Sequence, residues 1–227
     1  MKGTTFKVGV LFMMIVLAVG LFAFAAGCSN EDSDGESDGE VVTVTEGYSD
    51  DAVDLIRASD KLWDDFAFWA YNAIVAASLQ QPNYDAAATR WLAVAEDLGA
   101  VVSTYYGADA GATFTDALNK LQTDAVALVT AVLSDDAAGQ ETATQALSED
   151  IETIATFLDE ANPEYWPYDT VLGVLQNILD YTVDTATAII TGSWEESVTA
   201  FDTLRDEIMV LAYTFSSGVV GQFPDDF

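Results

Sequence analysis

The feature that most constrains the fold is the spacing of the apolar residues after Ser49. In successive segments they recur every three or four positions, which places them on one face of an α-helix. The expected helices cover about 49–79, 85–106, 113–132, 140–161, 167–191 and 193–215. No segment shows the period-two alternation of a half-buried strand. The pattern therefore predicts an all-α fold, an up-and-down bundle of about six helices.

Short polar motifs indicate where these helices begin and end. Ser49 is expected to cap the first helix, and Thr113 with Asp116 forms a capping-box pattern that predicts the start of the third. Gly192 followed by Ser193 predicts a tight turn between the last two helices, with the serine as N-cap.

The two halves of the helical part resemble each other. Residues 96–107 align with 152–163, and residues 117–129 align with 174–186. A duplicated helical hairpin is one interpretation. The alternative is that apolar helices resemble one another by default.

The N-terminal residues 1–27 have the layout of an export signal. Lys2 and Lys7 precede a charge-free apolar run, and the small residues Ala-Ala-Gly lead to Cys28, the chain's only cysteine. This is the pattern of a lipoprotein signal peptide, in which the thiol of the cysteine accepts a diacylglyceryl group and becomes the first residue of the mature chain. Two alternatives stay open, an uncleaved membrane-spanning helix and a chance placement of the cysteine.

Residues 28–47 are predicted to form an acylated cysteine and a flexible acidic tether. Acidic, serine and glycine residues dominate after Cys28, with too little apolar surface to fold alone. The predicted organisation is a signal peptide over 1–27, this tether over 28–47 and a helical-bundle domain over 48–227. Attached acyl chains would hold the protein durably at a membrane.

The charge balance excludes one class of partner. The chain has 38 acidic residues against 7 basic ones and no histidine, so it lacks the cationic surface that nucleic-acid binding requires. Excess acid with scarce lysine is typical of proteins from salty surroundings, where screening relieves self-repulsion. We therefore predict a salt-adapted bacterial or archaeal source; the alternative is a highly soluble exported domain.

Four stretches together resemble an uncharacterised family of helical-bundle proteins from bacteria and archaea. They are LWDDFAFWAYNAIVAAS at 62–78, EDLGAVVSTYYG at 96–107, IATFLDEANPEYWP at 154–167 and SSGVVGQFPDDF at 216–227. The more specific elements are ANPxxW and GxxxQFPxxF. The likeness spans nearly the whole helical part and implies the same bundle fold.

The chain departs from this family where the family carries histidines. The resemblance implies a histidine on the first, third and fifth helices, in patterns similar to LWxxH, LxxH and HLxxT, and three such imidazoles would suit a transition metal. The matching residues here are Phe66, Leu121 and Ile178. All three lie on the apolar stripes, so we expect them to fill space in mutual apolar contact, and no metal or other cofactor is predicted.

The remaining candidate residues have a structural interpretation beside each functional one. Adjacent carboxylates on a helix point about 100° apart, so they are weak cation sites and more typical of solvated faces. Such pairs are Asp64 and Asp65, Asp135 and Asp136, Glu195 and Glu196, and Asp225 and Asp226. Asp180 and Asp184, one turn apart, are the best acid–base candidates of a poor set.

Aromatic residues are plentiful, and they fit either a core or a pocket for a hydrophobic ligand. They include Trp63, Trp69, Trp91, Tyr105, Tyr106, Trp166, Tyr168 and Trp194. The core is the favoured interpretation.

The sequence as a whole predicts a lipid-anchored extracytoplasmic protein, at the cell surface or in the periplasm, that is not an enzyme. Its bundle would serve binding or structure, with a protein or a small hydrophobic ligand as the unidentified partner. The alternative is a metal-binding or enzymatic bundle that uses carboxylates in place of the family's histidines. That alternative requires three or more carboxylates converging in the core.

Overall fold

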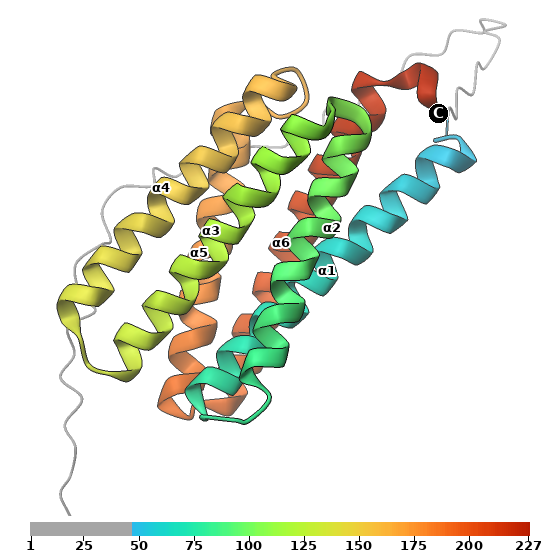
Figure 1. Cartoon of the computed structure of the whole chain (residues 1–227). Coiled ribbons are helices and arrows are strands. Elements are labelled where there is room, and N and C mark those ends of the chain that lie inside the picture. The colour runs from blue at the N-terminus through green and yellow to red at the C-terminus, as the bar shows by residue number, and fades with distance from the viewer. Residues whose placement is uncertain (1–46) are drawn as a thin grey trace, which may run out of the picture. The chain divides into compact units, whose positions relative to one another are not determined.

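The computed structural model describes residues 47–227, which belong to one compact unit. This part is an all-α bundle (Figure 1). Its elements are α1 (Asp50–Ser78), α2 (Tyr84–Tyr106), α3 (Ala108–Leu133), α4 (Ala137–Ala161), α5 (Tyr168–Thr191), α6 (Trp194–Gln222) and the 3₁₀ turn η1 (Pro224–Asp226). The predicted signal peptide, Cys28 and the tether up to residue 46 lie outside the described residues.

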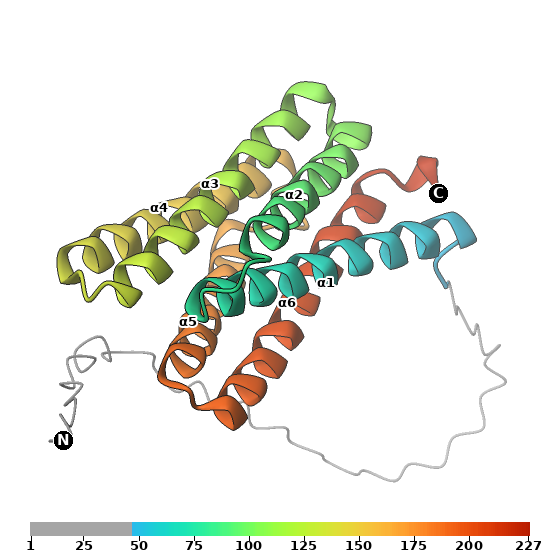
Figure 2. The same cartoon turned by 60° about the horizontal axis from the view of Figure 1, so that its bottom comes forward.

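The six helices run up and down and close into a ring. Each helix packs against its neighbour in the chain, and α6 packs back against α1 (Figures 1 and 2). α1 also contacts α3 and α5, so it lies toward the inside of the ring. The start of α1 and the end of α6 lie at the same end of the bundle (Figures 1 and 2). The predicted bundle is confirmed.

The helix starts follow the predicted capping residues in part. Ser49 caps α1, because its Oγ accepts a hydrogen bond of 3.1 Å from the backbone N–H of Ala52. Gly192 ends α5 in the left-handed conformation with φ of 75°, as expected. Ser193 occupies the N-cap position of α6, but the capping hydrogen bond predicted for it is absent.

The predicted capping box at the start of the third helix is wrong. α3 begins at Ala108, and Thr113 lies inside it with its Oγ1 donating to the carbonyl of Asp109 at 2.9 Å. Gly107, with φ of 92°, makes the whole connection from α2 to α3 by itself. A one-residue turn leaves no room for the loop expected over 107–112.

Gly111 belongs to this helix for a packing reason. A Cβ on Gly111 would lie 2.5 Å from the carbonyl oxygen of Gly99, and one on Gly99 would lie 2.8 Å from that of Gly111. α2 and α3 therefore touch backbone to backbone at this point. The interpretation of α2–α3 and α4–α5 as a duplicated hairpin stays a prediction.

A large apolar core runs through the ring, and a second, smaller cluster contains Ile74, Val129 and Ile189. The large core is organised around aromatic rings whose centroids lie 5.3–6.0 Å apart, starting from Trp91 on α2 and passing through Phe66 and Trp63 on α1 to Phe215 on α6 and Trp166. Trp166 and Phe215 stack with an angle of 4° between their planes. Such pairs stabilise beyond their buried area. Most of the aromatic residues named from the sequence therefore belong to the core or pack against it, which is the interpretation favoured there.

Between residues 47 and 227, none of the helices combines the length and the apolar character needed to cross a membrane.

Candidate functional site

The three positions matched to family histidines lie in or against the core. Phe66 is buried and meets Trp91 edge to face, with ring centroids 5.6 Å apart. Leu121 and Ile178 are half-buried and pack against the same cluster. Their expected mutual contact stays a prediction. α1, which carries Phe66, contacts both α3 and α5.

The residues of the specific motifs meet at one end of the bundle and hold it together. The buried side-chain amide of Asn162, in the α4–α5 link, donates to the carbonyl of Gly218 on α6 at 2.9 Å and to the hydroxyl of Tyr106 at 3.4 Å. That hydroxyl donates to Gln222 Oε1 at 2.5 Å. Burial raises the pKa of Tyr106 to about 12.

Trp166, also in the α4–α5 link, packs its ring against α6 and completes this contact. Its Nε1 donates to the carbonyl of Thr214 at 2.9 Å, and a Cβ on Gly218 would lie 2.1 Å from the same nitrogen. Phe223 contacts the rings of both Tyr105 and Tyr106. The ANPxxW and GxxxQF elements are thus complementary halves of one packing contact, which occupies their polar and aromatic groups.

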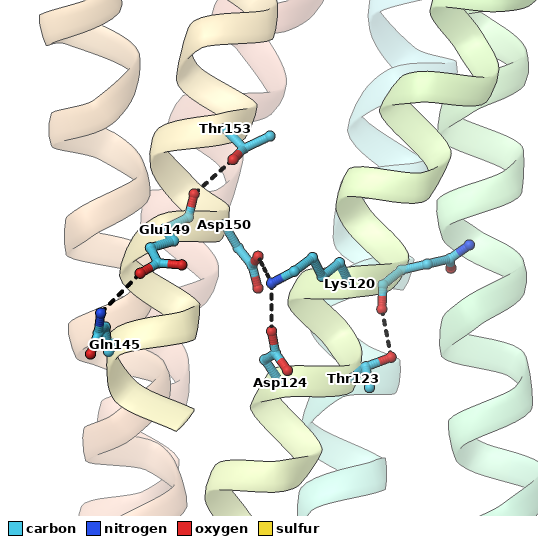
Figure 3. A network of polar contacts seen from close by, with 8 residues as sticks. Lys120, Thr123, Asp124, Gln145, Glu149, Asp150 and Thr153 are labelled. Atoms are coloured by element: carbon cyan, nitrogen blue, oxygen red, sulfur yellow. Dashed lines mark hydrogen bonds and ion pairs between the residues drawn. The ribbon is translucent and has the colours of Figure 1, made fainter. Parts of the chain in front are cut away.

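A charged network joins α3 to α4 (Figure 3). Lys120 Nζ donates to Asp124 Oδ2 at 2.9 Å and to Asp150 Oδ1 on α4. Asp150 is only 3% exposed, and its second oxygen has no hydrogen-bond partner. Burial raises the pKa of Asp150, whereas the bonds to Asp124 and Asp150 raise the pKa of Lys120.

This network connects α3 to α4, and its lysine is not suited to act as a nucleophile. A lysine whose ammonium is stabilised by two carboxylates stays protonated, and it therefore cannot attack a substrate. Sequence reasoning missed Asp150, although a signal was present: it follows Leu147 by three residues and precedes Ile154 by four, within the apolar stripe of α4.

The adjacent acids Asp64 and Asp65 form ion pairs with different basic residues. Asp64 pairs with Arg205 on α6 at 2.5 Å, while Asp65 pairs with Lys61 at 2.6 Å and with Arg90 at 3.6 Å. Within residues 47–227, no three His, Cys, Asp or Glu side chains gather closely enough to hold a metal.

The remaining candidate carboxylates lie on the outside of the bundle. Asp136 caps α4 by accepting from the N–H of Gly139 at 3.0 Å. Asp180 and Asp184 are largely exposed, and partial loss of contact with water together with the charge of Asp184 raises the pKa of Asp180. These two carboxylates are not enclosed in the apolar pocket that acid–base catalysis would need.

A hollow between α1 and α6 is the best candidate for a binding site. It has a volume of about 470 Å³ and is open to solvent. It combines two aromatic rings with four charged groups, and it is lined by Asp64, Asp65, Phe68, Phe201, Asp202 and Arg205. Ligand pockets of similar volume enclose most of their ligand, whereas this hollow is open. A second, apolar cavity beside Trp91 holds about 10 Å³, too little for a ligand.

Sequence reasoning found this hollow only in part. Asp64 and Asp65 were noted as an acidic pair, but Arg205 and Asp202 carry no local signal, since it is the return of α6 to α1 that brings them there.

The chain matches no family model, no curated protein and no solved structure. The family resemblance described above therefore stays a prediction.

Proposed function

We propose that the protein is a lipid-anchored, extracytoplasmic binding protein without catalytic activity. The observation that carries the proposal is the boundary at Cys28, where a charged start and an apolar run end in Ala-Ala-Gly-Cys and an acidic segment follows. Processing there removes two of the seven basic residues and none of the 38 acidic ones. The acidic segment would hold the bundle away from the membrane surface.

The binding role is supported by the way the bundle uses its side chains. The motif residues Asn162, Trp166 and Gly218 are engaged in packing, and Lys120 is engaged by two carboxylates. The α1–α6 hollow, by contrast, leaves Phe68 half exposed beside charged groups. We therefore assign partner binding to this hollow.

Substitution of Cys28 tests the anchor. The Cys28→Ala protein should leave the membrane fraction or accumulate as an unprocessed precursor, whereas the parent chain should partition with detergent. Mass spectrometry of the parent chain should find acyl groups on Cys28. Normal processing of the alanine variant with unchanged, detergent-requiring membrane association would refute the anchor.

A further inference from the structure

We propose that Tyr48 and Tyr213 form an oxidative cross-linking site, at which a peroxide-driven one-electron oxidant joins their rings by a carbon–carbon bond. The bond would fasten the start of α1 covalently to α6. The proposal goes beyond the binding role assigned above, and it depends neither on the lipid anchor nor on the α1–α6 hollow.

The first argument is a contact between two phenol groups from distant parts of the chain. The hydroxyls of Tyr48 and Tyr213 lie 3.2 Å apart, although the two residues are separated by 165 positions. Groups that a fold holds this close react as if they were present at very high concentration. Radicals formed on both rings would therefore couple with each other before either meets another molecule.

The second argument is the accessibility of the pair. Tyr48 and Tyr213 are 47% and 54% exposed, so an oxidant dissolved in water reaches both rings. The structure describes all nine tyrosines, and Tyr165 is the one other that is exposed. Tyr105 and Tyr106, by contrast, are half-buried against the ring of Phe223. Two of the three exposed tyrosines therefore form the pair.

The third argument is the freedom of one ring to turn. Coupling joins the ring carbons next to the hydroxyls, so the rings must rotate from their hydroxyl contact until these carbons meet. Tyr48 precedes the N-cap Ser49 and lies outside α1, so helical hydrogen bonds do not hold its backbone. Tyr213 is fixed within α6. One adjustable ring beside one fixed ring permits the closer approach.

The fourth argument is the lack of competing groups in the bundle. Thiols and thioethers are the side chains that oxidants attack most readily. The chain's one cysteine is Cys28, so residues 47–227 contain no thiol, and their one methionine, Met209, is half-buried. A radical on Tyr48 or Tyr213 therefore has no neighbouring thiol in the bundle to quench it.

The reaction balances with hydrogen peroxide as the oxidant. Each phenol loses one electron and one proton, and the two phenoxyl radicals form one bond between ring carbons ortho to their oxygens. The hydrogen on each of these carbons leaves as a proton, and each oxygen regains a proton, which restores both phenols. The pair loses two hydrogen atoms in total, and the peroxide takes them up to give two molecules of water.

The test oxidises the full-length protein in zwitterionic nanodiscs with a haem peroxidase and limiting hydrogen peroxide. A parallel run uses a small photochemical one-electron oxidant, so that access of the large enzyme does not decide the result. The protein is kept dilute, which disfavours coupling between molecules. We expect a monomer lighter by two hydrogen atoms, dityrosine fluorescence and, after proteolysis, a linked peptide pair that joins Tyr48 to Tyr213.

Matched variants locate the site. Tyr48→Phe and Tyr213→Phe should each lower the yield of the intramolecular link at least about tenfold, because phenylalanine has no hydroxyl hydrogen to lose. Tyr165→Phe removes the other exposed tyrosine and should leave the yield within about twofold of the parent, since Tyr165 is not part of the pair. Circular dichroism confirms that each variant is helical before oxidation.

The cross-link should also change stability. It closes a loop of 165 positions and so restricts the unfolded chain, which should raise the thermal midpoint by about 5 °C or more. Tyr48→Phe protein treated with the same oxidant should show no such rise. This comparison separates the effect of the bond from other oxidation of the chain.

Three results would overturn the proposal. They are the absence of a link between Tyr48 and Tyr213 with either oxidant, a link that persists in either phenylalanine variant, and cross-links that join separate molecules in preference to this pair. Each is distinct from failure of the anchor, because Cys28→Ala tests membrane association and leaves both tyrosines in place.

Discussion

Replacing Lys120 with methionine removes the cation between two carboxylates while keeping the apolar stem of the side chain. Asp150 then remains 3% exposed with neither oxygen paired to a cation. Breaking a buried ion pair on one side costs about 3–5 kcal/mol. Because the side chain of Lys120 is itself 59% exposed, we expect a loss of unfolding free energy near the lower end, about 3 kcal/mol.

Two further variants test whether this loss of unfolding free energy comes from the buried charge of Asp150. Lys61→Met removes the exposed pair between Lys61 and Asp65, also four residues apart, and should cost about 0.5 kcal/mol or less. Asp150→Asn in the Lys120→Met background removes the buried charge and should restore most of the lost stability. Urea unfolding followed by circular dichroism, at one fixed salt concentration, measures all of these free energies.

The pH dependence gives an independent check. Burial raises the pKa of Asp150 above its unfolded value, so its protonated form is favoured in the folded state. The stability that this shift contributes is present below the unfolded pKa and is lost as pH rises through the folded pKa. Without Lys120 the ionised carboxylate costs more, and the destabilisation of Lys120→Met should therefore shrink between pH 7 and about pH 4. A loss equal to that of Lys61→Met, or one that Asp150→Asn leaves unchanged, would refute the reasoning.

Other features of the bundle give sharper or simpler tests. Gly218→Ala places a Cβ 2.1 Å from Trp166 Nε1 and should destabilise by about 2 kcal/mol or more in the same assay. Gly173→Ala, in an open part of α5, should instead stabilise by about 0.5–1 kcal/mol, and equal effects at the two glycines would contradict the packing. The thermal midpoint should rise with added salt up to molar concentrations, since screening relieves self-repulsion; a flat response would remove the inferred salt adaptation.

The sequence predicts the bundle well because helical periodicity is a local property. Leu147, Ile151 and Leu158 lie on the core face as their spacing requires. The start of α3 differs from the prediction because Thr113 and Asp116 resemble a capping box although they lie inside the helix, where Thr113 donates to the carbonyl of Asp109. The turn is made by Gly107 alone, and a one-residue turn gives little signal in the sequence.

The candidate site was less predictable because its parts come from distant segments. Asp64 and Arg205 are separated by 141 positions, and their contact depends on the closure of the ring. Likewise, the stretches ANPEYW at 161–166 and GVVGQF at 218–223 are far apart in the sequence, and predicting their mutual packing requires knowing that Asn162 faces Gly218. Spacing along one helix gives no information about such pairs.

The packing between the α4–α5 link and the end of α6 also sets an order of events during synthesis. Tyr106 and Gln222 are 116 positions apart in the chain. A ribosome must therefore deliver α6 before this contact forms, and contacts between such distant residues form slowly. Until α6 is made, α1 and α5 each lack a neighbour and the ring stays open.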